Sequence, residues 1–388
     1  MAQLVQWSRH RLSGSFACTL LIGMVAMLPL SHCCWRPLAE GQEKLRDAAL
    51  RKAYSSDPFG CTPEKAASQA NKLVSGIKQR TYHSACADHW WLRHLAELNL
   101  KVPRHTTVVD VGCNKGYFSA TALNYLAPAH GDQLQKFYNS HLKQKVYSRP
   151  CGGCNECKQA PAKFPNHGQQ TVDVFCYEPS NIHLKSLTTA RDSVYGPPDT
   201  AISTEAAKDR THVRFHIRQA AVSNRTGVAQ FPVECNTNYC SLDSKSEGAL
   251  QSVNVTTIDT EMASLGLPYI DVLKIDTEGF DPAVLAGAYA ALRNHRIGIL
   301  SFEYHHLWSR SGGTLKQCSR YLQELGYICF YDGPVLAKIT GSCWDNRYEL
   351  KRWSNIVCVL QGSEMEVVMT SGSFIGRELG LELANMHH

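Results

Sequence analysis

Short apolar runs alternate with helical segments along most of the chain from Thr106 onward. Runs typical of strands cover residues 107–112, 172–178, 213–222, 253–259, 271–276, 297–305 and 355–360. Apolar residues recur at helical spacing over 117–127, 282–292 and 315–327. Strands that alternate with helices predict an α/β fold, with a mostly parallel sheet covered by helices on both faces. In such sheets, ligands bind at the carboxyl ends of the strands.

Two further segments precede this alternation. Residues 36–80 are polar and charged, and helix-favouring stretches within them predict a stem or an N-terminal helical cap. In "DHWWLRHLAEL", apolar residues recur at helical spacing, which predicts a helix that packs on the segment that follows.

The N-terminal segment from Ser13 to Trp35 contains no Lys, Arg, Asp or Glu, and Arg9 and Arg11 precede it. Its densest apolar part suits a signal-peptide core, whereas the whole segment reaches the roughly 20 residues of a membrane-spanning helix. We favour a signal anchor, because the arginine pair predicts a cytosolic N-terminus, although Arg36 weakens the charge asymmetry. A cleaved signal peptide and an N-terminal helix of the soluble fold are the alternatives.

The anchor predicts a single-pass type II membrane protein of the secretory pathway, with its body in the lumen of the Golgi or endoplasmic reticulum. A secreted or organellar protein is the alternative location. The chain contains 16 cysteines, which fit an oxidising compartment where thiols pair as disulfides. The net charge of +6 is spread along 388 residues without a basic run, so we expect no nucleic-acid partner.

An apparent insertion over residues 128–170 breaks the alternation and contains Cys151, Cys154 and Cys157. Structural zinc sites use four ligands, commonly as two separated pairs, and no second pair stands nearby at zinc spacing. Disulfides are therefore favoured over a metal. Zinc completed by His167 or Cys176 remains an alternative.

Candidate chemistry begins at the first strand, whose end reads "VVDVGCNKGYFS". Asp110, Gly112 and Gly116 lie between a strand and a helix, where glycines allow a sharp turn and close approach to a ligand. Glu178 ends the next strand, the position at which nucleotide-binding sheets use a carboxylate to bind ribose hydroxyls. The two features together predict a nucleotide-type ligand, whereas the glycine turn alone would be weak evidence.

The stretch "DVLKIDTEGFDPAVL" places Asp276 and Glu278 at the end of a third central strand, on the same rim. Pro282 suits the first turn of the next helix, and Asp281 is interpreted as its cap. The following strand, "ILSFEYHH", brings Glu303, His305 and His306 to the rim as well.

These motifs resemble the FkbM-type methyltransferases, which use S-adenosylmethionine. The resemblance runs from about Thr106 to Leu360 without the insertion, and its strongest element is K-I-D-x-E-G followed by "VLAGA". It implies a Rossmann-like, seven-stranded methyltransferase sheet and transfer to hydroxyl groups of sugars or polyketide-like compounds. It implies no required metal.

The resemblance also assigns roles to individual residues. Glu178 would hold the ribose of the cofactor, and Asp276 would lie beside its methyl sulfonium. Asp110, Gly112 and Gly116 would line the methionine side of the cofactor. Asn114, in the same turn, completes the predicted cofactor-binding set.

The acceptor hydroxyl must lose its proton as the new bond forms, so the rim must provide a base. The candidates are Asp276, Glu278, Glu303 and His305, and we place Asp276 nearest the hydroxyl. The predicted activity is therefore O-methylation of a glycan or small alcohol. A nucleotide-sugar or dinucleotide enzyme, and a catalytically silent binding domain, are the alternatives.

The predicted organisation has four parts. A cytosolic tail with the membrane or signal segment covers 1–36, and a stem with an N-terminal helical region covers 37–100. The methyltransferase domain covers 101–365, and a C-terminal tail covers 366–388.

Overall fold

The computed structural model describes residues 60–87, 89–101, 105–127, 133–144, 151, 153–154, 171–197, 212–233, 249–374 and 376. The predicted membrane segment, Cys157 and His167 lie outside these residues. Within the described part of the chain, no helix has both the length and the apolar character needed to cross a bilayer.

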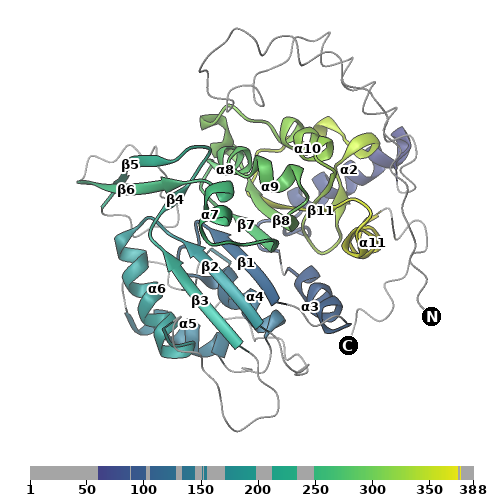
Figure 1. Cartoon of the computed structure of the whole chain (residues 1–388). Coiled ribbons are helices and arrows are strands. Elements are labelled where there is room, and N and C mark those ends of the chain that lie inside the picture. The colour runs from purple at the N-terminus through teal and green to yellow at the C-terminus, as the bar shows by residue number, and fades with distance from the viewer. Residues whose placement is uncertain are drawn as a thin grey trace, which may run out of the picture. The chain divides into compact units, whose positions relative to one another are not determined.

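Eight described strands form the main sheet, in the order β10-β9-β11-β8-β7-β1-β2-β3 (Figure 1). Neighbouring strands from β3 to β8 are parallel, whereas β11 runs antiparallel to both β8 and β9. The strands are β1 His105–Val111, β2 Thr171–Tyr177, β3 His212–Arg218, β7 Ile270–Ile275, β8 Ile297–Tyr304, β9 Tyr327–Tyr331, β10 Ala337–Lys338 and β11 Ser354–Leu360.

The strand count differs from the seven that the family resemblance implies. The additional strand is β10, which pairs antiparallel with β9 at the edge of the sheet. With two residues, β10 is too short to produce a periodic hydrophobic pattern in the sequence.

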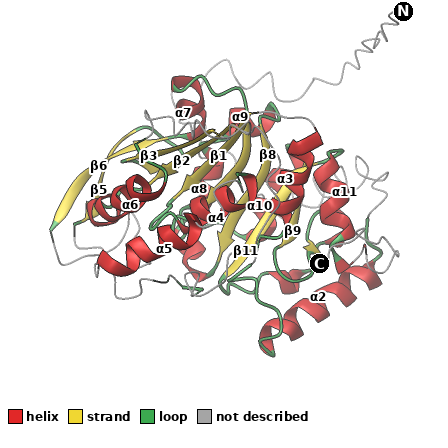
Figure 2. Ribbon diagram, turned by 90° about the horizontal axis from the view of Figure 1, so that it is seen from below, coloured by secondary structure: helices red, strands yellow, loops and turns green. Residues whose placement is uncertain are grey.

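Helices cover both faces of the sheet, as the alternation predicts. Figure 2 shows α7 and α9 on one side of the strands and α4, α5 and α6 on the other. α11 packs against α3 and β11. The helices are α2 Pro63–Lys78, α3 Trp91–Lys101, α4 Tyr117–Leu126, α5 Gln133–Gln144, α6 Asn181–Val194, α7 Ile258–Ser264, α8 Asp281–Ala286, α9 Tyr289–Arg293, α10 Leu315–Glu324 and α11 Glu364–Ser371.

The central strands are buried on both faces, which explains their near-continuous apolar sequences. Every residue of β7 is buried. Val108, Val174 and Val272 come from three neighbouring strands and are 0% exposed in one hydrophobic core. This core fixes the strands rigidly, so side chains at their ends are held in defined positions.

The run at 253–259 does not extend the main sheet. Its first residues belong to β6 (Leu250–Thr256), which lies between β4 (Ala221–Val222) and β5 (Gly227–Pro232) in a separate three-stranded sheet. β6 pairs antiparallel with β5, and Figure 1 shows both strands beside the main sheet. The hydrophobic pattern identified an extended segment but carried no information about which sheet it joins.

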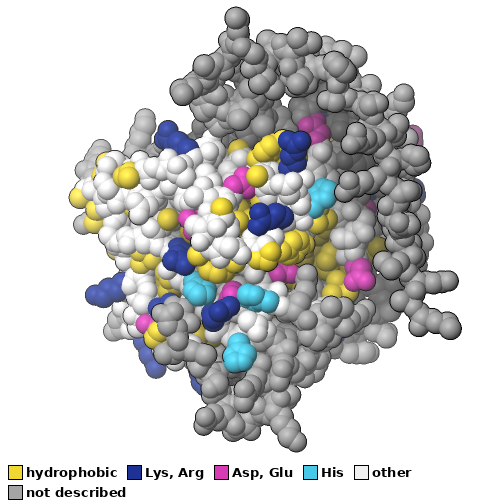
Figure 3. Space-filling model, in the orientation of Figure 1, with side chains coloured by type: hydrophobic (Ala, Val, Ile, Leu, Met, Phe, Trp, Pro, Cys, Tyr) yellow, Lys and Arg dark blue, Asp and Glu magenta, His cyan; other side chains and the backbone are white. Residues whose placement is uncertain are grey.

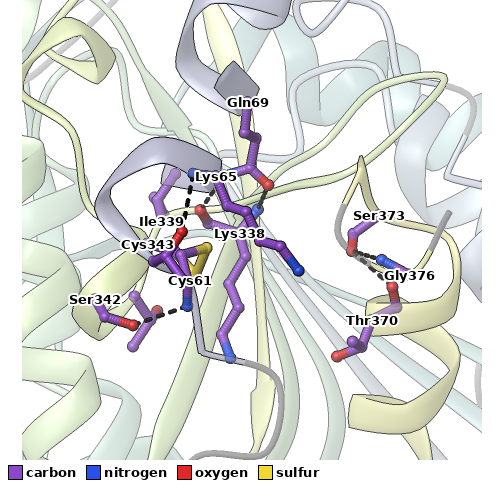
Figure 4. The surroundings of a disulfide bond; sticks show 12 residues. Cys61, Lys65, Gln69, Lys338, Ile339, Ser342, Cys343, Thr370, Ser373 and Gly376 are labelled. Atoms are coloured by element: carbon purple, nitrogen blue, oxygen red, sulfur yellow. Dashed lines mark hydrogen bonds between the residues drawn. A yellow bond between two sulfur atoms is a disulfide. The ribbon is translucent and has the colours of Figure 1, made fainter. Parts of the chain in front are cut away.

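α2 is attached to the β10 edge of the main sheet, which is the edge opposite β3 (Figure 4). The Cys61–Cys343 disulfide joins residues 282 positions apart. The side-chain amide of Gln69 donates to the carbonyl of Lys338 at 2.7 Å, and the Lys338 N–H donates back to Gln69 Oε1 at 3.1 Å. Gln69 thus binds the backbone of β10 as a neighbouring strand would.

An ion-pair cluster lies across β1, β2 and β3. Nε and Nη2 of Arg214 are each 2.5 Å from a carboxylate oxygen of Asp173, and Nε2 of His105 is 2.7 Å from its Oδ2. Figure 3 shows histidine side chains gathered with basic and acidic ones over these strands. Burial alone would raise the pKa of Asp173, but hydrogen bonds from His216 and Arg214, with the charge of Arg214, lower it to about 2.

Candidate active site

A cavity of about 670 Å³ lies at the carboxyl ends of β1, β2, β7 and β8. These strands are parallel, so their ends meet at one edge of the sheet. The cavity brings together eight of the nine residues predicted to bind the cofactor or to act as the base, and His306 lines it as well. The eight are Asp110, Gly112, Asn114, Glu178, Asp276, Glu278, Glu303 and His305.

The turn after β1 fits tightly against the turn after β7. Gly112 has a φ of +75°, and a β-carbon at this position would overlap the carbonyl oxygen of Asp276. Glycine is therefore required here for both its backbone conformation and the close approach. The same turn continues through Asn114, which has a φ of +50°.

Gly116, predicted to line the methionine side of the cofactor, is not among the described residues that line the cavity. It precedes α4 with a φ of +71°, and a β-carbon there would lie 2.6 Å from Cδ1 of Leu187. Gly116 therefore allows α4 and α6 to pack closely.

Glu178 links the first two strand ends. Its Oε2 accepts a hydrogen bond from the Asn114 N–H, and its Oε1 accepts one from the Ser180 N–H, both at 2.8 Å. Nδ1 of His183 lies 3.5 Å from Oε1. Each carboxylate oxygen can accept a further hydrogen bond, so Glu178 is fixed in place but retains capacity for a ligand.

A disulfide between Cys113 and Cys176 joins the same two strand ends covalently. A second disulfide, Cys86–Cys154, contributes both of its cysteines to the cavity wall. Cys151 is also disulfide-bonded. The zinc alternative therefore fails in this oxidised structure, because the thiolates of Cys154 and Cys176 are consumed in disulfides.

Asp110 is 1% exposed and accepts a hydrogen bond from the Ser119 hydroxyl at 2.6 Å. Burial raises its pKa to about 7, although the Ser119 hydrogen bond and the charge of Lys274 oppose the shift. Asp110 thus connects β1 to the first turn of α4.

Asp276 is half-buried on the cavity wall directly after β7. Glu278 follows with a φ of +54°, a left-handed conformation that is unusual for a residue with a side chain. The turn therefore presents two carboxyl-bearing residues to the cavity at some cost in backbone strain.

Asp281 is structural, as expected, but it is not the helix cap. α8 begins at Asp281 itself, and its N-cap is Phe280. The fully buried Asp281 carboxylate accepts hydrogen bonds from Thr277 Oγ1 and from the Gly279 and Glu303 N–H groups. It therefore ties the Glu278 turn to β8, and Pro282 lies in the first turn of α8 as predicted.

Glu303 is 5% exposed at the end of β8. Its Oε1 accepts a hydrogen bond from Nε1 of Trp353 at 2.6 Å. Burial raises the pKa of Glu303 well above its usual value, and the nearby charges of Asp276 and Glu278 add to the shift. Glu303 is therefore biased toward its protonated form, in which it can donate a hydrogen bond.

His305 is oriented by its own backbone neighbourhood. Its Nδ1 accepts a hydrogen bond from the Leu307 N–H at 3.3 Å, and its Nε2 lies 3.7 Å from Oε2 of Glu303. Because the lone pair on Nδ1 is in use, the proton of the neutral ring is assigned to Nε2. His306 is exposed and begins the short helix η4 (His306–Arg310).

Comparison with known proteins identifies the domain that contains most of this site. Residues 168–329 match the family model described as the methyltransferase FkbM domain. The chain contains an FkbM methyltransferase domain. The match includes Glu178, Asp276, Glu278, Glu303 and His305, whereas the glycine turn after β1 precedes it.

Two other comparisons give no further evidence about the function of the FkbM domain. A search of curated proteins gave no match. The precorrin-6y C5,15-methyltransferase of Geobacter metallireducens GS-15 has 10% identity and a TM-score of 0.28, over 70% of this chain and 87% of that one. A likeness this weak carries no argument about fold or function.

One group in the described part of the FkbM domain has metal-ligand chemistry. Ligand atoms of Glu278, Glu303 and His305 all lie within 4.8 Å of one another. However, a metal would have to displace either the Leu307 hydrogen bond at Nδ1 of His305 or the proton assigned to Nε2. The hydrogen bonding therefore favours a proton-bearing polar cluster over a metal centre.

Several residues that line the cavity were not predicted from the sequence. Lys115 is 4% exposed, and Trp353 gives its ring N–H to Glu303. His89 precedes α3 and also lines the cavity. Lys115 stands next to a recognised motif residue, but no local pattern marks His89 or Trp353 as part of the site.

Proposed function

We propose that this protein transfers a methyl group from S-adenosylmethionine to a hydroxyl group of a glycan or small alcohol. The FkbM domain supports methyl transfer as the reaction class. The proposal is carried by one observation: Gly112, Glu178 and Asp276 come from three different strand ends and line a single cavity. This set provides close backbone approach, a hydroxyl-binding carboxylate and a negative charge for a cationic sulfonium.

The chemistry of the cavity fits the cofactor. Glu178 is held by Asn114 and Ser180 and keeps hydrogen-bonding capacity for two ribose hydroxyls. Gly112 leaves room where a β-carbon would project. The volume of about 670 Å³ lies in the usual range for small-molecule sites.

The arrangement of the acids indicates how the acceptor molecule would be bound. Methyl transfer requires the acceptor oxygen, the methyl carbon and the leaving sulfur to be held in line. Asp276 would hold the acceptor hydroxyl beside the methyl group. Glu303, biased toward its neutral form, and the N–H of His305 would donate hydrogen bonds to other oxygens of a polyhydroxylated acceptor.

We further propose that the protein is anchored by residues 13–35 with its catalytic body in the secretory pathway. Four disulfides join pairs of described cysteines, which supports maturation in an oxidising compartment. Protease protection in microsomes tests this topology. Digestion of the body without detergent would contradict it.

Titration calorimetry tests the cofactor assignment directly. S-adenosylmethionine should bind, whereas NAD⁺ and a uridine diphosphate sugar should not. Transfer of a labelled methyl group to glycans released from cells that lack the protein, and to a set of small alcohols, then tests the reaction. Absence of S-adenosylmethionine binding at millimolar concentration would contradict the proposal.

A further inference from the structure

His89 and Asp332 form a pair at the cavity that lies outside the predicted set of acids. Nδ1 of His89 lies 3.4 Å from Oδ2 of Asp332. The His89 side chain is 16% exposed and lines the cavity, whereas the Asp332 side chain is fully buried behind it. The pair therefore has one buried end and one end that faces the ligand space.

The Asp332 carboxylate is firmly positioned. Nε1 of Trp91 donates a hydrogen bond to its Oδ2 at 3.0 Å, and its backbone N–H donates to the carbonyl of Asn355 at 2.9 Å. Its buried Oδ1 has no hydrogen-bond partner among the described residues. A buried carboxylate needs donors or positive charge nearby, and His89 can provide either.

The His89 ring is held from several sides. It makes edge-to-face contacts with Phe118 and Trp91, with ring centroids 5.3 and 5.7 Å away. The residue has a φ of +52°, a conformation that fixed surroundings must maintain. The preceding segment is tied to the fold by the Cys86–Cys154 disulfide.

The neighbouring carboxylate decides which ring nitrogen carries the proton. Nδ1 of His89 is buried and makes no hydrogen bond in the described part of the chain, and the nearest charged acceptor is Oδ2 of Asp332 at 3.4 Å. An ionised carboxylate only accepts, so a hydrogen bond between the two groups requires the proton of neutral His89 on Nδ1, which leaves the lone pair on Nε2. The approach at 3.4 Å is long for a hydrogen bond, but catalytic hydrogen bonds often shorten when substrate binds. His305 has the opposite arrangement, because its Nδ1 accepts from the Leu307 N–H.

We propose that Nε2 of His89 accepts the proton of the acceptor hydroxyl, with Asp332 as its positioning residue. This inference rests on the proposed methyl transfer. The hydroxyl oxygen bonds to the methyl carbon while the methyl–sulfur bond breaks and its electron pair remains on sulfur. The hydroxyl proton passes to His89, and Asp332 stabilises the resulting imidazolium. Asp276 remains at the cationic end of the methyl donor.

Nitrogen NMR of the full chain tests the pair without cofactor or acceptor. In ¹⁵N-histidine-labelled protein, the His89 signals are those lost in His89→Gln. We expect a ring protonated at Nδ1 in the wild type and a shift toward protonation at Nε2 in Asp332→Asn. Trp91→Phe removes the other hydrogen bond to Oδ2 of Asp332 and should keep the wild-type tautomer. Protonation of wild-type His89 at Nε2 would overturn the proposal.

Turnover tests the catalytic role, with labelled methyl transfer to the released glycans as the assay. His89→Gln should lose about 10²- to 10⁴-fold in rate. Its affinity for S-adenosylmethionine should remain that of the wild type, and circular dichroism should confirm folding. If the wild type binds no S-adenosylmethionine, the proposed function itself fails. If it binds and His89→Gln turns over normally, only the role of His89 is overturned.

Discussion

Gly112 lies directly against the carbonyl oxygen of Asp276, although the two residues end different strands. Gly112→Ala should therefore push the two turns apart and weaken S-adenosylmethionine binding by at least tenfold. The left-handed backbone adds strain of about 1–2 kcal/mol. Calorimetry and chemical denaturation measure the two effects.

Gly266→Ala is the matched control for this substitution. Gly266 has a similar φ of +63°, but a β-carbon there would meet no atom within 4 Å. We expect a loss of about 1 kcal/mol in the free energy of unfolding and unchanged cofactor affinity. Equal cofactor affinities in the two variants would show that the close approach at Gly112 is unimportant.

Asp276→Asn should lower turnover by about 10²-fold or more. The amide keeps the shape of the side chain but removes the charge that is proposed to lie beside the sulfonium. Cofactor affinity should change little, because other residues are proposed to hold the ribose and the methionine end. Steady-state kinetics together with calorimetry separate the two effects.

Asp259→Asn makes the same chemical change away from the cavity. The Asp259 carboxylate accepts hydrogen bonds from the N–H groups of Ala290 and Ala291 at the start of α9. Its loss should reduce stability by about 1 kcal/mol and leave turnover intact. Full activity of Asp276→Asn would remove Asp276 from the mechanism.

The Cys113–Cys176 disulfide should matter for ligand affinity as well as for stability. It fixes the glycine turn relative to the Glu178 end of β2. Replacing both cysteines with serine should weaken S-adenosylmethionine binding several-fold. Neither cysteine of the Cys61–Cys343 pair lines the cavity, so its double serine variant should lose stability but keep cofactor affinity. Identical cofactor affinities would contradict this division of roles.

Asp173 should make stability dependent on acid pH. Its folded-state pKa of about 2 is below the value of about 3.9 in an unfolded chain. The stabilisation is therefore present above about pH 4 and is lost as the pH falls through 2. After allowance for solvent screening at the partly exposed Arg214, we expect about 1–2 kcal/mol.

Asp173→Asn should consequently destabilise the protein at pH 7 and much less near pH 2. Denaturation measured across this pH range provides the test. Asp345→Asn, at the pair with Arg347 whose carboxylate is more exposed, should have a smaller effect than Asp173→Asn. A pH-independent difference between Asp173→Asn and the wild type would contradict the assignment.

Features that depend on neighbouring residues could be predicted from the sequence. Glu178 and Asp276 each follow an apolar strand, so their place at the carboxyl edge follows from local pattern and sheet geometry. Gly112 and Gly116 look alike in the sequence, yet one faces Asp276 and the other faces Leu187. Only the packing of distant segments separates a ligand-facing glycine from a helix-packing one.

Long-range pairs account for most of what the sequence could not reveal. Trp91 and Asp332 are 241 residues apart, and the hydrogen bond between them helps to orient the pair proposed here. The disulfide partners of Cys86 and Cys113 were equally hidden, because spacing does not determine connectivity. The membrane segment, the location and the domain boundaries stay predictions.

The contact between Gln69 and β10 has a consequence for how copies of this protein behave toward one another. An exposed edge strand invites another chain to add its own strand, which is a common start of aggregation. At Lys338 both backbone groups are already bound by a side chain of the same molecule. The Gln69 amide therefore ends the sheet there and protects the protein against edge-to-edge association with another copy during folding.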